Sequence, residues 1–325
     1  LATRIYFASH RLWKSNNRGD SWTAISGDLT RDQDRFTLPI MGGTQSWDNA
    51  WDVGAMSMYN TITSVSESPQ QEGLIYVGTD DGLVQVTEDG GANWRKIEVG
   101  SMPGVPATAF VNDVKADMHD VNTVYVIMDN HKYGDYSPYV MKSTDQGRSW
   151  KSMRANLPDR TLAWRIVQDH VDKDLMFIAM EYGIHFTVDG GSTWVKLTGN
   201  MPTISFRDLA IHKRENDLVG ASFGRGFFVL DDYTSLRDVS NEQLAQEATL
   251  FGVRKAWWYV PRPMLSFDDT RGSQGSDHYV APNPEFGATF TYYLRDSMQT
   301  LKQVRQEAEK KAVANGQAVA FPGWD

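Results

Sequence analysis

The amino-acid sequence predicts an all-β fold, a β-propeller made of four-stranded blades. Three observations predict it: a turn motif that occurs four times, two strand-like runs before the motif, and a short strand-like run after it. Four antiparallel strands in a repeat of about 40–50 residues are typical of a propeller blade, whereas the repeats of a β-helix are shorter. About 4–5 blades are visible, so we expect a ring that is incomplete in this chain.

The repeated motif reads Ser/Thr-x-Asp-x-Gly-x-Ser/Thr/Asn-Trp, and it predicts a hairpin turn. The Asp side chain accepts hydrogen bonds from backbone N–H groups ahead of it, and Gly takes a turn conformation that other residues resist. The Trp begins the return strand and is expected to bury its ring. We therefore interpret these positions as structural: Asn17 (in place of Asp) and Trp22, Asp89 and Trp94, Asp145 and Trp150, and Asp189 and Trp194.

Three strands are expected before the motif in each complete unit. The predicted strands lie at 61–66, 74–79 and 82–87, at 110–115, 123–128 and 139–143, and at 163–169, 175–180 and 183–187. A fifth unit at 208–232 keeps three strands, but its motif is reduced to Asp231-Asp232-Tyr233, with no Gly or Trp after it. We therefore expect the propeller to end near this point.

Composition excludes several partners and chemistries. Lys and Arg number 32 against 41 Asp and Glu, and the formal net charge of −9 disfavours nucleic acid and anionic membranes as partners. The absence of cysteine excludes disulfides, Cys-ligated zinc and thiol catalysis. The seven His form no metal-like cluster and the Gly-rich segments form no phosphate loop, so we expect neither a metal nor a cofactor. No apolar run approaches the length of a membrane span.

The chain is expected to be an internal or C-terminal-half piece of a longer polypeptide, because it starts without Met in a strand-like run and stops just after a helix. The rest of that polypeptide, or another chain, would then complete the propeller. Three segments are predicted: blades at 1–235, a linker with an extended aromatic and Gly-rich stretch at 236–285, and a further module from 286–325. Apolar residues at helical spacing predict an amphipathic helix at 296–315.

The motif resembles the Asp-box, or BNR repeat, of sialidases, sortilin-type receptors and xyloglucanase-type glycosidases. Residues 60–233 resemble large exported bacterial proteins described as BNR-repeat, sortilin-like or glycosyl hydrolase-like. The residues that carry this resemblance are Tyr76-Val77-Gly78-Thr79-Asp80-Asp81-Gly82-Leu83-Val84, Ala155-Asn156-Leu157-Pro158 and Phe223-Gly224-Arg225-Gly226-Phe227-Phe228-Val229-Leu230-Asp231-Asp232. The resemblance implies a periplasmic or secreted protein and, from 286 on, the start of a β-sandwich-like module with an inserted helix.

The functional face is expected opposite the motif turns, on the loops between second and third strands and on the connections between blades. Loop carboxylates near aromatic rings are what a glycosidase needs, and arginines on inner strands could clamp a carboxylate. The candidate catalytic acids are Asp48, Asp52, Asp80, Asp81 and Glu181. The candidate ligand-binding residues are Trp47, Trp51, Tyr59, His131, Tyr133, Tyr136, Arg165, Tyr182, Arg207 and Arg225.

Structural interpretations compete with each of these assignments. Asp80-Asp81-Gly82 also suits a turn, the two inner-strand arginines could pair with neighbouring acids, and Trp47 and Trp51 could pack the long stretch at 27–60. We expect a non-catalytic module that binds protein, peptide or glycan. The alternatives are a glycoside hydrolase of xyloglucanase or sialidase type, and a scaffold domain. Two carboxyl groups about 5–5.5 Å or about 6.5–9.5 Å apart in an open cleft would favour the hydrolase.

Overall fold

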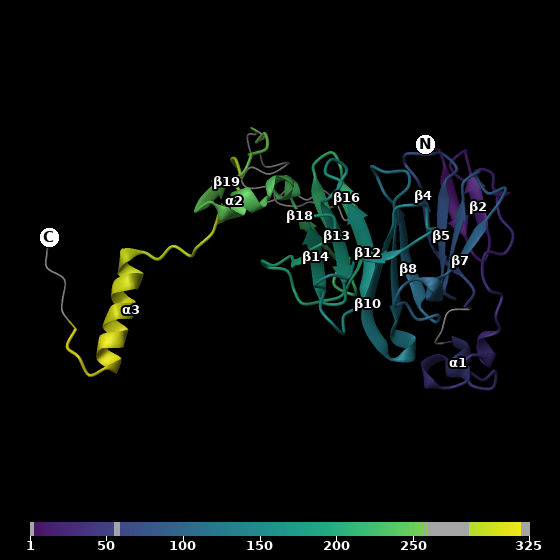
Figure 1. Cartoon of the computed structure of the whole chain (residues 1–325), viewed down its shortest axis with the longest axis horizontal. Helices are drawn as coiled ribbons and strands as arrows, with labels where there is room; N and C mark the ends of the chain where they lie inside the picture. The colour runs from purple at the N-terminus through teal and green to yellow at the C-terminus, as the bar shows by residue number, and fades with distance from the viewer. Residues whose placement is uncertain (1–2, 55–58, 257, 259–285, 320–325) are drawn as a thin grey trace, which may run out of the picture. The chain divides into compact units, whose positions relative to one another are not determined.

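The computed structural model describes residues 3–54, 59–256, 258 and 286–319. The chain divides into two compact units, Leu1–Arg237 and Asp238–Asp325, and each is described by itself. Antiparallel sheets follow one another in chain order through the first unit, from purple to teal in Figure 1. We call these five sheets blades 1 to 5.

The three middle blades have four strands and the two outer ones have three. Blade 1 holds β1 (Ile5–Ala8), β2 (Leu12–Ser15) and β3 (Thr23–Ala24), and blade 2 holds β4 (Ile62–Glu67), β5 (Ile75–Thr79), β6 (Leu83–Thr87) and β7 (Arg95–Glu98). Blade 3 holds β8 (Phe110–Ala116), β9 (Val124–Asn130), β10 (Asp135–Ser143) and β11 (Lys151–Ser152), and blade 4 holds β12 (Ala163–Gln168), β13 (Met176–Met180), β14 (Gly183–Thr187) and β15 (Val195–Lys196). Blade 5 holds β16 (Phe206–His212), β17 (Asp217–Ser222) and β18 (Phe227–Leu230). The predicted all-β fold, an incomplete β-propeller of antiparallel blades, is confirmed.

The first strands of neighbouring blades lie next to one another and are joined by polar contacts. The buried Asp113 of β8 accepts from the Ser64 hydroxyl of β4 at 3.1 Å and from the N–H of Ile166 in β12 at 3.1 Å. Arg165 donates to Asp113 at 2.9 Å and lies 3.4 Å from Asp208 of β16. These inner strands line a polar cavity of about 300 Å³.

The four motif turns share one hydrogen-bond pattern, each between the third and fourth strands of a blade. In blade 2, the Thr87 hydroxyl donates to Asp89 at 2.8 Å and accepts from the N–H of Gly91 at 2.9 Å, while Asp89 accepts from the N–H of Asn93 at 2.9 Å. Hydrogen bonds from Asn93, first from its side chain, lower the pKa of Asp89 to about 2. The same bonds occur around Asn17, Asp145 and Asp189.

The motif tryptophans connect a blade to the one before it. The indole N–H of Trp94 donates to the carbonyl of Ile25 in blade 1 at 3.3 Å, and that of Trp194 donates to the carbonyl of Met153 in blade 3 at 2.9 Å. Trp150 is 9% exposed in the core between blades 2 and 3. Trp22, in contrast, is 41% exposed, because no sheet precedes blade 1 among the described residues. The expectation that every motif Trp is buried is thus wrong for Trp22.

The second unit contains α2 (Asn241–Ala245), the antiparallel pair β19 (Ala248–Leu250) and β20 (Tyr292–Leu294), and α3 (Leu301–Ala314). The helix predicted at 296–315 begins at Leu301, because Thr300 caps it in a capping box with Gln303. Most of the stretch predicted as linker at 236–285, and the end of 286–325, lie outside the described residues. No helix in the described ranges is long and apolar enough to span a membrane.

Candidate functional site

The pairing of the strands places the motif turns and the candidate loops at opposite ends of the blades. The motif turn of blade 2 lies beside the β4–β5 turn, where the N–H of Gly90 donates to the carbonyl of Gly73 at 2.9 Å. At the other end, the β5–β6 loop meets the start of β4, where Asp80 accepts from the N–H of Thr61 at 2.7 Å. We call this second end the loop end, and blades 3 and 4 repeat the arrangement.

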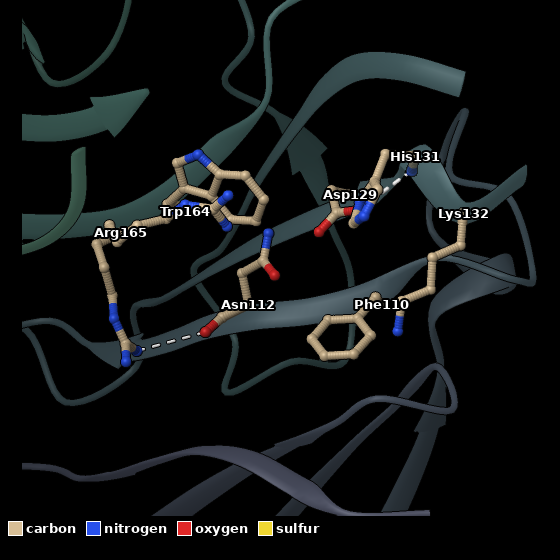
Figure 2. Close-up of a pocket in the computed structure, with 8 residues that line it drawn as sticks. Phe110, Asn112, Asp129, His131, Lys132, Trp164 and Arg165 are labelled. Atoms are coloured by element: carbon tan, nitrogen blue, oxygen red, sulfur yellow. Dashed lines mark hydrogen bonds and ion pairs between the residues drawn. The ribbon is translucent and has the colours of Figure 1, made fainter. Parts of the chain in front are cut away.

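A pocket of about 290 Å³ opens at the loop end between blades 3, 4 and 5. Figure 2 shows its side chains, which come from the starts of inner strands, from the end of β9 and from the β9–β10 loop. The lining residues are Phe110, Asn112, Asp129, His131, Lys132, Trp164, Arg165 and Arg207. Only His131, Arg165 and Arg207 among them were predicted from the sequence. The loop-end pocket therefore combines aromatic rings with cationic side chains.

Two cations of the pocket lie against aromatic rings. The guanidinium of Arg207 lies 3.5 Å from the centroid of the Trp164 ring. The same guanidinium makes a long ion pair of 4.0 Å with the Glu181 carboxylate. The Lys132 ammonium lies 4.6 Å from the centroid of the Phe110 ring. Within the described part of the chain, Lys132 makes no ion pair within 4.0 Å, and its pKa is lowered by burial. Cations held on ring faces keep N–H donors available for an incoming acceptor.

Asp129 supplies the carboxylate of the pocket, and it is already engaged. It is almost fully buried, accepts from the backbone N–H of His131 at 3.1 Å, and pairs with the His131 ring (Figure 2). The His131 ring in turn meets the edge of Trp164, with centroids 6.3 Å apart. Asp129 thus orients the His131 ring at the wall of the pocket.

Arg165 points toward the inner strands, where it donates to the carbonyl of Asn112 at 3.3 Å (Figure 2). It also pairs with Asp113. This is the ion pairing that the structural interpretation expected for the inner-strand arginines. Arg207 differs, because its guanidinium is stacked on the Trp164 ring and its ion pair with Glu181 is long, at 4.0 Å.

A much smaller cavity of about 10 Å³ lies beside the loop-end pocket, lined by Tyr59, Asp80 and Tyr133 together with Ile40 from the long 27–60 stretch. Such a volume holds about one water molecule. Burial raises the pKa of Asp80 to about 6, and the neighbouring Lys132 counteracts part of that rise. Burial also raises the pKa of Tyr133. Asp80 is therefore an acid of this region whose pKa lies close to neutral.

The other predicted acids each have partners within the fold. Asp81 accepts from the backbone N–H of Arg31 at 2.6 Å and from the hydroxyl of Thr79. Glu181 accepts from the Trp164 indole and from the Ser205 hydroxyl, both at 3.0 Å. Neither Asp81 nor Glu181 lines the loop-end pocket.

The remaining predicted residues lie on the long 27–60 stretch or on exposed loops. Asp52 of α1 (Ala50–Gly54) accepts from the N–H of Ser46 at 2.8 Å, and Asp48 is exposed. Trp47 stacks on Phe36 with centroids 3.9 Å apart. Trp51, Tyr136, Tyr182 and Arg225 are exposed and do not line the loop-end pocket. The sequence-predicted set is thus divided over several separate places.

Five pocket residues were missed from the sequence: Phe110, Asn112, Asp129, Lys132 and Trp164. Phe110 and Trp164 stand at the starts of predicted inner strands, and Lys132 lies between two predicted loop residues. Proximity to either end of a predicted strand at the loop end of a blade is the signal that could have found them. Within the described residues, no group of three or more His, Cys, Asp or Glu could hold a metal ion.

No family model matches the chain, and no curated protein does. Among solved structures, a GH74 enzyme of Niastella koreensis is 12% identical with a TM-score of 0.49, over 72% of this chain and 34% of that one. An ancestral GH74 enzyme is 17% identical with a TM-score of 0.47, over 68% and 26%. YCF48 from Cyanidioschyzon merolae is 11% identical with a TM-score of 0.39, over 78% and 85%. The chain spans about a third or less of the two GH74 enzymes.

Proposed function

We propose that this chain belongs to an exported, non-catalytic β-propeller protein that binds an acidic group of a protein, peptide or glycan in the loop-end pocket. The Asp-box resemblance of the four motif turns supports an exported, periplasmic or secreted location. The rest of the same polypeptide, or another chain, would complete the ring. The negative net charge of −9 argues against nucleic acid as the ligand.

One observation carries the proposal: Arg207 and Lys132 face the same pocket, where Arg207 makes only a long ion pair of 4.0 Å with Glu181 and Lys132 makes none within 4.0 Å in the described ranges. A carboxylate entering the pocket would accept from the Arg207 fork and from the Lys132 ammonium. The rings of Trp164 and Phe110 offer apolar surface beside these charges, which suits a sugar ring or an aromatic side chain. The ligand class is therefore an acidic group joined to a flat or ring-shaped body.

The test is a screen of acidic ligands against their neutral counterparts. Oligogalacturonates would be compared with galactose oligomers, and acidic peptides with their amidated forms, by calorimetry on the whole chain. We expect Arg207→Gln to weaken binding of the acidic members about tenfold or more, the effect of one charge-assisted hydrogen bond pair. Arg225→Gln is the matched control, because Arg225 is an exposed arginine outside the pocket. Equal losses in the two variants would contradict the assignment.

A second candidate is glycoside hydrolysis, and the observation that favours it is the raised pKa of Asp80, about 6, which suits a general acid. Against it, the cavity that Asp80 lines has room for about one water and none for a sugar ring. Asp80→Asn, assayed on xyloglucan and on sialosides, tests this candidate. Hydrolysis by the unmodified chain that is lost in a folded Asp80→Asn variant would establish it.

A further inference from the structure

The motif tryptophans define a row of equivalent places between blades. Each motif Trp packs near a residue of the preceding blade that lies three positions after that blade's own motif Trp. Trp94 donates a hydrogen bond to the carbonyl of Ile25, Trp150 shares a buried cluster with Ile97, and Trp194 donates to the carbonyl of Met153. The same spacing after Trp194 leads to Leu197. A fifth indole would therefore be expected beside Leu197, between blades 4 and 5.

That fourth place in the row contains a cavity instead of an indole. Blade 5 has no motif, since β18 is followed by Asp231-Asp232 and then by η5 (Tyr233–Asp238). The cavity has a volume of about 220 Å³, and its mainly apolar walls include Ile184, Leu197, Met201, Leu218, Phe228 and Leu230. An apolar cavity of about 150 Å³ is large enough to bind benzene. The space therefore suits one large aromatic side chain.

An open strand edge lies next to this cavity. β18 pairs with β17, and within the described part of the chain it has no second neighbour, whereas β6, β10 and β14 each pair with a fourth strand. Phe227 and Val229 of β18 are 76% and 55% exposed. An unpaired edge of this kind is a template for an added strand, with pockets for alternate side chains giving specificity.

We propose that the cavity and the β18 edge form a docking site for an extended segment of a partner polypeptide. The segment pairs antiparallel with β18, as a fourth strand does in blades 2 to 4, and its tryptophan enters the cavity beside Leu197. The site continues the row of blade–blade interfaces within this chain. Because each of those interfaces receives a fourth strand with a motif Trp, we expect the partner segment to supply a strand and a tryptophan. It is separate from the loop-end pocket and does not depend on its ligand.

The experiment uses a peptide that copies residues 187–197, the fourth motif with its following strand, and the same peptide with the tryptophan replaced by alanine. Binding to the whole chain would be followed by fluorescence anisotropy of the labelled peptides. We expect the tryptophan peptide to bind at least tenfold more tightly than the alanine peptide. Equal affinities, or no saturable binding of the tryptophan peptide, would overturn the proposal. Self-association of the chain that the peptide does not displace would overturn it in favour of a second copy.

Two kinds of variant locate the peptide. The N–H of Ser222 donates to the carbonyl of Gly226, so the alternation of the ladder directs the N–H of Val229 toward the open edge. Val229→Pro removes that donor, whereas the control Val229→Ala keeps it, and we expect only the proline variant to lose binding. Met201→Trp fills the cavity and should abolish binding even if the proline variant does not fold. Full binding by folded Met201→Trp would contradict the proposal.

Discussion

Arg165 and Arg207 have the same chemistry but different surroundings. Arg165 neutralises the buried Asp113, while Arg207 lies on the Trp164 ring. Removing one partner of a buried pair leaves the other charge uncompensated. Arg165→Gln should therefore cost about 2–3 kcal/mol of unfolding free energy, less than the about 3–5 kcal/mol of a fully buried pair, because Arg165 is partly exposed and Asp113 keeps other donors. Arg207→Gln should cost under about 1 kcal/mol. Urea denaturation measures both, and the reverse order would show that the two roles are exchanged.

Asp80 makes the free energy of unfolding of the chain depend on pH. Its folded pKa of about 6 lies above 3.8, the usual value of an Asp carboxyl, so folding favours the protonated form. That contribution is fully present below about pH 4 and is lost as the pH rises through about 6. Asp80→Asn should therefore be more stable than the unmodified chain at pH 7, by up to about 3 kcal/mol, with little difference at pH 4.

Denaturant unfolding at the two pH values measures this difference. Asp81→Asn is the control, since Asp81 is equally buried but accepts from Arg31 and Thr79, and its loss should be destabilising at pH 7. An Asp80→Asn variant that is less stable than the unmodified chain at pH 7 would contradict the account of Asp80.

At the scale of single elements, two adjacent glycines of one motif turn have different requirements. Both have positive φ, but a Cβ on Gly91 would lie 2.3 Å from the carbonyl oxygen of Ile25, whereas a Cβ on Gly90 would meet nothing within 4 Å. Gly90→Ala should cost about 1 kcal/mol for the left-handed conformation alone. Gly91→Ala should cost about 3 kcal/mol or more, because backbone must also move. Equal shifts in thermal unfolding would show that blade 1 does not approach this turn.

The blades could be predicted from sequence because their signal is local. The motif marks the β6–β7, β10–β11 and β14–β15 turns, and the runs before it are short, continuous and largely apolar, as in β5 and β13. Most strand limits differ from the predicted ones by one or two residues, as for β16, which begins at Phe206 and not at 208, but β10 begins four residues earlier than predicted, at Asp135. Such limits depend on pairing with β17, which the local pattern does not contain.

The candidate site was less predictable because its contacts join residues about 50 positions apart. Arg165 reaches Asp113 from the neighbouring blade, and Arg207 reaches Trp164. The packing of two blades decides which inner-strand residue faces which cation. The sequence of either blade alone does not predict this pairing. The predicted acids were found individually, yet Asp81 and Glu181 are held by partners that only the folded chain supplies.

At the scale of the whole first unit, stability depends on the cores between blades. Trp150 lies in the core that blades 2 and 3 share, while Trp22 lies on blade 1 with 41% of its surface exposed. Trp150→Ala should cost about 3–5 kcal/mol, and Trp22→Ala about 1 kcal/mol, because one indole leaves a cavity and the other mostly does not. Guanidinium denaturation of the two variants measures both losses of unfolding free energy. A Trp22→Ala variant that is as destabilised as Trp150→Ala would contradict this difference.

In the function that we propose, the loop-end pocket holds an acidic group between Arg207 and Lys132. The most direct measurement is calorimetric titration of the whole chain with trigalacturonate and with its methyl ester, and with an acidic peptide and its amide. These pairs keep the body of the ligand and remove only its charge. We predict that the acid of at least one pair binds at least tenfold more tightly than its neutral form, and that the preference disappears in Arg207→Gln. Equal affinity of acid and neutral form in both pairs would contradict the claim.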